Sequence, residues 1–218
     1  MTAEPRDPPI PPLPPGSATS GASASPRGVS DARERILRTS YNLFCRGGIH
    51  GTGIDRIVAD AGVAKATLYR HFASKDDLVR AVLEVRENLW THGWLEYEAQ
   101  RRGTTPVARL LAVFEALDDW FRRDGYEGCL FINSLLETAG QHSPVFDAAA
   151  RKQANVRVVL ATLAKEAGAA DPASLAFEWQ TLMCGAIVLA TAGDPEAARR
   201  ARGIAELLLD REGLHSPG

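Results

Sequence analysis

Apolar residues recur every three or four positions along most of the chain after residue 30, which is the spacing of helices with one buried face. No stretch alternates apolar and polar residues with a period of two, so the pattern predicts an all-α fold. Expected N-terminal caps at Ser30, Ser74 and Asp171, and glycines at helix ends, bound the periodic runs. Together they predict about nine helices, near residues 30–47, 52–61, 65–72, 74–100, 106–121, 129–139, 144–167, 171–192 and 194–209.

The first thirty residues differ from the rest of the chain. They hold eight of the thirteen prolines, with Gly, Ala and Ser filling most other positions. Such a segment buries too little apolar surface to offset its ordering entropy, which predicts a disordered Pro-rich tail over 1–30. A polyproline ligand for another domain is the alternative. The remaining chain divides into a small helical domain at 31–77 and a larger one at 78–218.

The short helix, three-residue turn and short helix between residues 52 and 72 form a helix-turn-helix pattern. Gly62 suits the left-handed backbone of the sharp turn, and Val63 fills the angle between the helices. We expect Leu68 and Phe72 to pack against Phe44 of the first helix. The alternative is a three-helix packing unit that binds no DNA.

This packing leaves one face of the third helix free to enter the major groove of DNA. Lys65 lies at its exposed N-terminal end, Ala66 allows close approach, and Thr67 can contact a base edge or a thymine methyl. Phosphate contacts are expected from side chains beside this face and from the start of the second helix. The predicted contacts are therefore Thr52, Lys65, Ala66, Thr67, Tyr69, Arg70 and His71.

The run from Thr52 to Leu78, with "Ala-Gly-Val" followed by "Leu-Tyr-Arg-His-Phe-Ala-Ser-Lys-Asp-Asp-Leu", resembles the N-terminal domain of the TetR family of bacterial transcriptional regulators. The resemblance covers about residues 33–80 without a gap. It implies that Lys75 anchors a phosphate and that the fourth helix transmits ligand state to the DNA-reading domain. The sequence departs from the family at Gly53, Ala64 and Ala66, which leaves the operator open. Ala64 also removes a helix cap, at a cost of about 1 kcal/mol.

Charge is distributed unevenly along the chain. The formal net charge is −2, but residues 31–75 carry eight Lys and Arg against four Asp and Glu, whereas residues 76–218 carry 15 against 21. A basic segment before an acidic remainder is typical of a DNA-reading module on a separate body. We therefore expect double-stranded DNA as a partner.

The resemblance implies that the last two helices pair with those of a second copy in a four-helix bundle. The sequence agrees, because the helix near 174–190 is apolar and carries Gly185 and Ala186, which allow close approach. The last helix adds a narrow stripe of small residues. The alternative is that both helices only build the core of the single chain.

An effector pocket is expected among the large apolar side chains of the second domain. Each of these residues can equally be plain core. His92 and Glu96, one helical turn apart, can orient a polar group of a ligand or simply form a solvated pair. The candidate pocket residues are Trp90, Trp94, Phe114, Phe131, Trp179 and Met183.

Cys129 follows Gly128 at a predicted helix start that resembles the sixth helix in one branch of the family. A helix N-terminus lowers a thiol pKa, so Cys129 is a candidate sensor of oxidants or electrophiles. A buried structural thiol is the alternative.

Composition excludes several other classes. Three widely spaced cysteines form neither a disulfide framework nor a zinc cluster, which favours a reducing cytoplasm. The longest apolar run, Leu182–Ala192, is too short to span a bilayer, and the Pro-rich, weakly charged residues after Met1 contain no apolar h-region, so we expect no transmembrane segment and no signal peptide. The sequence contains no di-iron, phosphate-loop or nucleophile-elbow motif, so we expect no enzyme activity, no metal and no cofactor.

We expect a homodimeric repressor that binds a palindromic operator and is released by a small molecule. One alternative is that the protein activates transcription. Another is that it is an adaptor protein that uses the Pro-rich tail.

Overall fold

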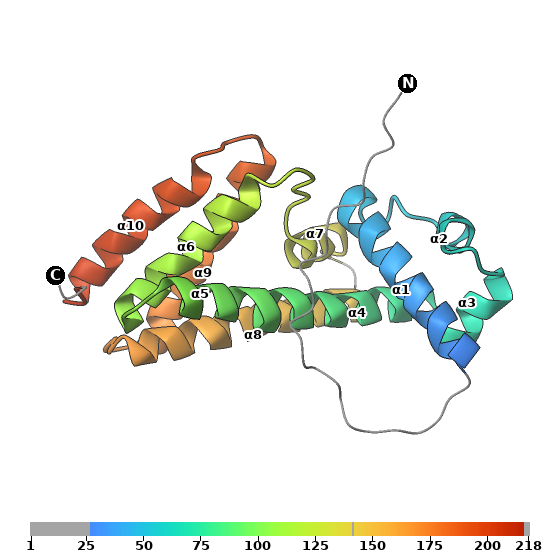
Figure 1. Ribbon diagram of the computed structural model, residues 1–218, viewed down its shortest axis with the longest axis horizontal. Helices are drawn as coiled ribbons and strands as arrows, with labels where there is room; N and C mark the ends of the chain where they lie inside the picture. Colours follow the sequence, from blue (N-terminus) through green and yellow to red (C-terminus); the bar gives the residue numbers. More distant parts are fainter. Residues whose placement is uncertain (1–26, 141, 216–218) are drawn as a thin grey trace. The chain divides into compact units, whose positions relative to one another are not determined.

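The computed structural model describes residues 27–140 and 142–215. Every regular element in these residues is helical (Figure 1). Because α4, η1 and α5 follow one another without a break, the described part has nine helical segments, which confirms the predicted fold. The elements are α1 (Arg27–Gly47), α2 (Ile54–Ala61), α3 (Lys65–His71), α4 (Lys75–Arg86), the π-helix η1 (Glu87–Leu95), α5 (Glu96–Arg102), α6 (Pro106–Phe121), α7 (Leu130–Glu137), α8 (Pro144–Glu166), α9 (Pro172–Thr191) and α10 (Ala197–Arg211).

The described residues divide into two compact units. The head unit contains residues 27–88 and 127–156, which are α1 to α4, α7 and the first half of α8. The body unit contains residues 89–126 and 157–215, which are most of η1, α5, α6, the end of α8, α9 and α10. Residues 1–26 of the expected tail lie outside the described residues. The domain boundary expected after residue 77 stays a prediction.

The first helix begins at Arg27, so Ser30 lies inside it, and the prediction that Ser30 caps this helix was wrong. The reason lies in the spacing: Val29 precedes Ala32 by three residues and Ile36 by seven, so the helical spacing of apolar residues already begins before Ser30. Ala32 and Ile36 are both buried.

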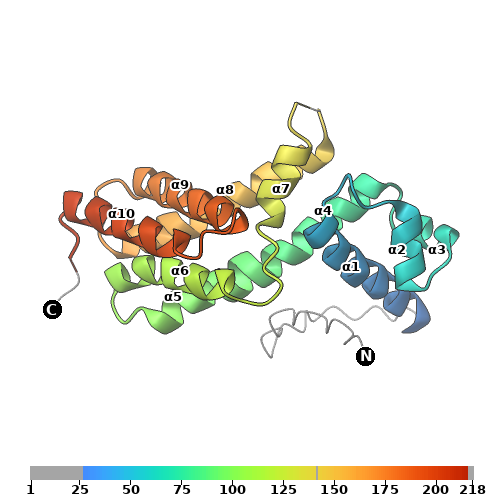
Figure 2. The ribbon, with the colours of Figure 1, turned by 90° about the horizontal axis from the view of Figure 1, so that it is seen from above.

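In the head unit, α1 packs against α2, α3 and α4 (Figures 1 and 2). Its core is built from large apolar side chains one helical turn apart. The Ser74 hydroxyl accepts a hydrogen bond from the Asp77 N–H at 3.1 Å, which confirms the predicted cap of the fourth helix. The largest fully buried side chains here are Ile36, Phe44, Ile57, Leu68, Leu78, Leu83 and Phe131.

In the body unit, α9 packs against α10 and α6, and α5 packs against α6 (Figure 2). Thr105 caps α6 and Asp171 caps α9, each followed by a proline in the first helical turn. The Trp179 indole N–H donates to the Leu110 carbonyl at 3.1 Å, which ties α9 to α6. The last helix starts at Ala197, later than expected, because Asp194 first accepts the Glu196 N–H in a turn.

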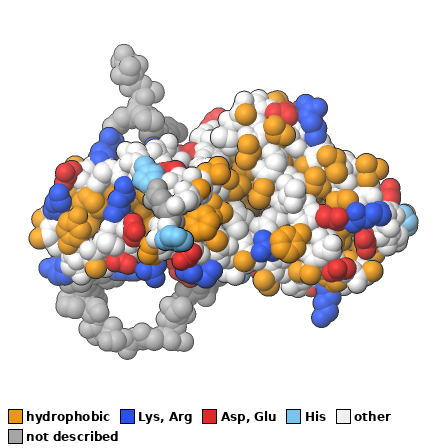
Figure 3. Space-filling model, turned by 180° about the vertical axis from the view of Figure 1, so that it is seen from behind, with side chains coloured by type: hydrophobic (Ala, Val, Ile, Leu, Met, Phe, Trp, Pro, Cys, Tyr) orange, Lys and Arg blue, Asp and Glu red, His pale blue; other side chains and the backbone are white. Residues whose placement is uncertain are grey.

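Helix α9 is the one described helix long and apolar enough to cross a membrane by length and composition. The shorter run considered in the sequence, Leu182–Ala192, understated its length. Only 39% of its most apolar window is buried within the chain, so much of the helix presents apolar side chains outward. Figure 3 shows exposed apolar side chains among charged ones on one face of the molecule. A helix of this kind is weak evidence for a membrane span, because core and interface helices share its composition.

Candidate nucleic-acid interface

The turn between α2 and α3 is a left-handed helix end centred on Gly62. Its φ is 61° and its ψ is 42°, a conformation that glycine adopts without strain. The Gly62 N–H donates to the Ala59 carbonyl and the Val63 N–H to the Val58 carbonyl, which closes the end of α2. This sharp ending allows α3 to begin after only three intervening residues. The pattern expected between residues 52 and 72 is therefore a helix-turn-helix in the structure.

The inner face of α3 holds the helix against the rest of the head unit. Leu68 is fully buried and Phe72 is 5% exposed, and Ile57 and Phe44 are buried beside them on α2 and α1. The Arg33 guanidinium lies over the Phe72 ring at 5.4 Å from its centroid. This packing determines which side of α3 faces outward.

The residues expected on the outer face of α3 are found there. Lys65, Ala66, Tyr69 and Arg70 are exposed, whereas Thr67 and His71 are half-buried. Ala64 at the start of α3 makes no side-chain capping hydrogen bond, as its departure from the family pattern predicted. The Nε2 atom of His71 is buried without a hydrogen-bond partner among the described residues, so a phosphate contact from this atom requires the ring to turn.

Thr52 differs from its expected role. Its side chain is buried, and its hydroxyl donates to the Gly48 carbonyl at 2.8 Å and approaches the Leu43 carbonyl at 3.3 Å. A phosphate accepts hydrogen bonds and therefore needs the proton that this hydroxyl already gives to the backbone. The structure assigns the Thr52 side chain to the end of α1, and only backbone N–H groups at the start of α2 stay available for a phosphate.

The two lysines of the predicted interface both have partners. The Lys65 ammonium donates to Asp55 at 2.8 Å, and this hydrogen bond raises the pKa of Lys65 above its ordinary value. Both side chains are exposed, so the pair can open when a phosphate approaches. Lys75 donates to the Ile49 carbonyl at 2.5 Å, and its partial burial lowers its pKa. A phosphate contact by Lys75 therefore competes with an internal hydrogen bond.

Other cations of the head unit were not singled out from the sequence. Arg56 pairs with Asp60 at 2.6 Å on α2, and Arg46 pairs with Glu127 at 2.8 Å. The Arg35 Nε–H donates to the Ala61 carbonyl at 3.3 Å. The basic excess at 31–75 indicated cations on this unit, but only the fold shows which of them are already paired.

Three tryptophans form one aromatic cluster in the body unit. The ring of Trp90 lies 5.4 Å from that of Trp94 and 5.5 Å from that of Trp120, and Tyr126 meets Trp120 edge-on at 5.0 Å. The Trp94 indole N–H and the Thr91 hydroxyl are buried without hydrogen-bond partners among the residues described. Trp90, Thr91 and Trp94 all belong to the π-helix η1, a geometry often found at functional sites.

The other candidate pocket residues are buried core side chains. Phe114 contacts Trp179 with ring centroids 5.5 Å apart, and Met183 is buried on the same helix as Trp179. Phe131 is buried in the head unit and is not part of the body unit. Their role in an effector pocket stays a prediction.

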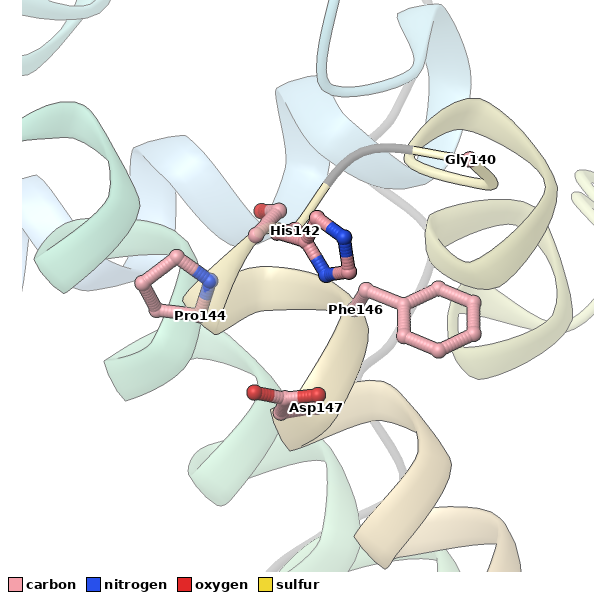
Figure 4. A pocket seen from close by; sticks show the side chains of 6 residues that line it. Gly140, His142, Pro144, Phe146 and Asp147 are labelled. Carbon is pink, nitrogen blue, oxygen red and sulfur yellow. The ribbon is translucent and has the colours of Figure 1, made fainter.

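Two open hollows lie in the head unit, and none of the candidate pocket residues lines them. One of about 530 Å³ lies where α8 begins, where His142 and Pro144 lie beside Phe146 and Asp147 (Figure 4). The other, of about 340 Å³, lies between α4 and α8 and is lined mainly by charged residues. These charged residues are Asp77, Arg80, Glu84, Arg151 and Lys152. Among the described residues no group of His, Cys, Asp and Glu is arranged to hold a metal ion.

Cys129 does not have the lowered thiol pKa that its place before a helix predicted. Burial raises the pKa of Cys129, and this outweighs the Arg86 charge and the hydrogen bonds from the N–H groups of Phe131 and Ile132. Burial likewise raises the pKa of Cys45 to about 11. The expectation was wrong because sequence position does not reveal desolvation, and the structure favours the alternative of a buried structural thiol.

Comparisons with known proteins agree with this geometry. Residues 36–82 match a family described as bacterial regulatory proteins, tetR family, and residues 106–205 match the tetracyclin repressor-like C-terminal domain. A TetR-family transcriptional regulator from Streptomyces coelicolor is 30% identical, with a TM-score of 0.76, over 84% of this chain and 96% of that one. A putative regulator of this kind from Streptomyces avermitilis is 28% identical, with a TM-score of 0.74, over 84% and 99% of the two chains.

Curated relatives match mainly around the helix-turn-helix. The HTH-type transcriptional activator FasR of Mycolicibacterium smegmatis is 35% identical over 94 residues, which are 43% of this chain and 42% of FasR. The HTH-type transcriptional regulator LmrA of Bacillus subtilis is 41% identical over 59 residues, which are 26% of this chain and 31% of LmrA. The matched stretches thus span less than half the length of these relatives.

Proposed function

The chain belongs to the TetR family of bacterial transcriptional regulators, and from this premise we propose that it represses transcription as a homodimer that leaves its operator when a small molecule binds. It is a transcriptional regulator with a helix-turn-helix DNA-binding domain, and its relatives are regulators rather than enzymes. We place it in the cytoplasm, where its operator is accessible. Repression, dimerisation and release by an effector are the parts that we propose.

The observation that carries the DNA-binding proposal is the outer face of α3. Its inner face is anchored by Leu68, while Lys65, Ala66, Tyr69 and Arg70 stay exposed on the other side. Lys65, which is flexible, and Ala66, which is small, allow the start of the helix to approach base edges. Tyr69 and Arg70 can reach phosphates. With Thr67 and the backbone at the start of α2, these residues form the proposed interface.

The test is selection of bound fragments from random double-stranded DNA by the purified full-length protein, followed by sequencing. We expect a palindromic site whose half-sites lie about one helical turn apart. Affinity for that site should fall steeply with added salt because bound phosphates release counterions. No enrichment at low salt would overturn the proposal and favour an adaptor role.

A dimer is supported by the outward apolar side chains of the last two helices. On α9 they are Phe177, Val188 and Leu189, and on α10 they are Ile204 and Leu207. Side chains of this size rarely stay in water as a group on a single folded chain. Pairing α9 and α10 with those of a second copy covers them and sets two copies of α3 against two half-sites.

The aromatic cluster on η1 supports an effector of matching chemistry. Trp90, Trp94 and Trp120 offer ring faces, and the Trp94 N–H and Thr91 hydroxyl offer hydrogen bonds beside them. We propose a planar aromatic effector that carries a hydrogen-bond acceptor. A panel of such compounds should quench tryptophan fluorescence in the wild type and much less in Trp94→Phe; compounds that release operator without changing this fluorescence would exclude the cluster.

The route from effector to DNA is proposed along the continuous helical segment from Lys75 to Arg102. The segment carries the aromatic cluster at its centre and begins directly after the helix-turn-helix. In the mechanism that the family implies, effector binding moves this segment and changes the separation of the two copies of α3. Spin labels on the two heads test it: release of DNA without any change in their separation would refute it.

Activation is the second candidate, because the relative FasR is named an activator. Repression and activation differ only in what the bound dimer does at its promoter. A reporter gene placed behind the selected operator distinguishes them, since repression lowers its output and activation raises it when the regulator is expressed.

A further inference from the structure

The last residue of α7, Glu137, holds the loop between α1 and α2. Its Oε1 accepts the Ile49 N–H at 3.1 Å and its Oε2 accepts the His50 N–H at 2.7 Å, although these residues lie 88 and 87 positions apart in the sequence. One carboxylate thus receives two successive backbone N–H groups. Hydrogen bonds to an ionised acceptor are stronger than those between neutral groups.

A second contact joins the other end of α7 to the same region. Glu127, three residues before α7, accepts a hydrogen bond from the Arg46 guanidinium at 2.8 Å in the last turn of α1. Between the two ends, Leu130, Phe131 and Ser134 of α7 are buried. Helix α7 is therefore attached to the end of α1 and to the loop that follows it at two points.

The loop itself is adapted to this attachment. Gly48 has a φ of +70°, so a side chain at this position would be strained, and its Cβ would lie 2.7 Å from Glu137 Oε1 and displace that carboxylate. The Thr52 hydroxyl donates to the Gly48 carbonyl, and the Lys75 ammonium donates to the Ile49 carbonyl. Side chains thus bind both donors and acceptors of this loop, at Gly48, Ile49 and His50, four to six residues before α2 starts at Ile54.

We propose that Glu137 is a positioning residue for DNA binding: it holds the α1–α2 loop, and through it the start of α2, in the conformation that fits the operator. The inference rests on the proposed DNA-binding function. Because α7 follows α6 in the chain, it also supplies a second route, besides α4, from the body unit to the helix-turn-helix: the chain connects α6 to α7, and the hydrogen bonds of Glu137 connect α7 to the α1–α2 loop.

The direction in which operator affinity changes separates this proposal from a purely electrostatic effect of Glu137. Replacing a carboxylate by a neutral amide removes a negative charge from the DNA-binding unit, which by itself strengthens binding to DNA. In Glu137→Gln the amide keeps one acceptor oxygen but places an N–H₂ group against the second N–H donor. We therefore expect operator affinity to fall, by about tenfold, which corresponds to the loss of one hydrogen bond to a charged group.

The experiment compares Glu137→Gln with Glu166→Gln in the full-length protein. Glu166 is the last residue of α8, as Glu137 is of α7, but its recorded partner is Arg109 of the body unit at 3.4 Å. Operator affinity is measured at 25 °C, after circular dichroism has compared the helix content of each variant with that of the wild type, together with amide exchange at Ile49 and His50. The expected result is weaker operator binding and faster exchange of these two amides in Glu137→Gln alone.

The contrary outcome is equally clear. Unchanged or tighter operator binding by Glu137→Gln overturns the proposal even if its thermal stability falls, because a purely structural role lowers stability without changing the affinity of the folded protein. If this variant does not fold, the wild type decides: unprotected amides at Ile49 and His50 would exclude the contact. Failure of the wild type to select any operator would instead refute the proposed function.

Discussion

Arg70 and Tyr69 are the side chains of α3 with the most freedom to meet DNA. Both are exposed, and the described residues offer Arg70 no hydrogen bond or ion pair, in contrast to Lys65 with Asp55 and Arg56 with Asp60. An unpaired guanidinium contributes to phosphate binding without first breaking an internal contact. We therefore expect Arg70 to contribute more to DNA binding than either paired cation.

Replacing Arg70 by Ala should weaken binding to specific and random DNA by about tenfold and reduce the salt dependence of binding by about one counterion. Fluorescence anisotropy titrations at several salt concentrations measure both quantities. Arg123→Ala, an exposed arginine of the body unit, is the matched control and should change neither. An unaltered salt slope in Arg70→Ala would show that this side chain does not reach a phosphate.

The half-buried thiol of Cys45 gives a second prediction at the residue scale. Burial raises the pKa of Cys45 to about 11, so at pH 7 only about one Cys45 in ten thousand is a thiolate. Iodoacetamide should therefore label Cys45 of the folded protein far more slowly than after unfolding, with a rate that rises about tenfold per pH unit. Mass spectrometry of the labelled peptides measures this rate. Rapid labelling of Cys129 at pH 7 would restore the electrophile-sensor hypothesis.

At the scale of elements, the sequence predicts best what local chemistry decides. Ser74 and Asp171 are caps whose side chains need only their own helix, and both were identified correctly. The contacts of Thr52 and Glu137 could not be found in this way, because their partners lie across a loop or about ninety residues away. The π-helix was also missed, since the sequence of residues 87–95 carries the same apolar spacing as an α-helix.

Helices α4 and α8 are joined by a buried ion pair in the head unit. The Lys152 ammonium donates to Glu87 and to Glu84, each at 2.5 Å, and the Asn155 amide donates to Glu87 at 2.6 Å. Burial lowers the pKa of Lys152, but its hydrogen bonds to the two carboxylates outweigh burial and hold the pKa above its usual value. Glu87 is the first residue of η1, so this pair lies where α4 changes to the π-helix.

Lys152→Met should destabilise the protein by about 3–5 kcal/mol, because it leaves the Glu87 carboxylate buried without its cation. The double variant Glu87→Gln with Lys152→Met should recover much of this loss. Since the folded pKa of Lys152 is raised, its contribution is complete below the unfolded value of about 10.4 and is lost as pH rises through the folded value. Urea unfolding between pH 7 and 11 measures both effects; a wild type and a Lys152→Met variant of equal stability at pH 7 would contradict the role of the pair.

At the scale of the whole molecule, the sequence indicated both DNA binding and a second copy. The match around the helix-turn-helix arises from residues that are constrained by the turn and by the packing beneath α3. The effector residues could not be assigned in the same way, because Trp90 and Trp94 have the spacing of any buried helix face. Only the structure shows that they meet Trp120, which comes from a different helix.

The dimer is tested by placing charge on the apolar side chains of the last two helices. Leu207 is 66% exposed on α10 and Leu189 is half-exposed on α9. The double variant Leu189→Glu with Leu207→Glu should keep its helical circular dichroism but have the mass of one chain in light scattering, and it should lose operator binding. Tyr97→Glu, at an equally exposed aromatic residue of α5, is the control and should stay dimeric. A double variant with the mass of two chains would place the interface elsewhere.

The exposed leucines of α9 and α10 also affect how the regulator responds to its own copy number. If operator binding requires two chains that meet through this face, then below the dissociation constant of the dimer the occupied fraction of operator rises with the square of chain concentration. Halving expression would reduce occupancy about fourfold in that range. Expression of a gene controlled in this way changes steeply with small changes in synthesis or dilution of the regulator, before any effector is present.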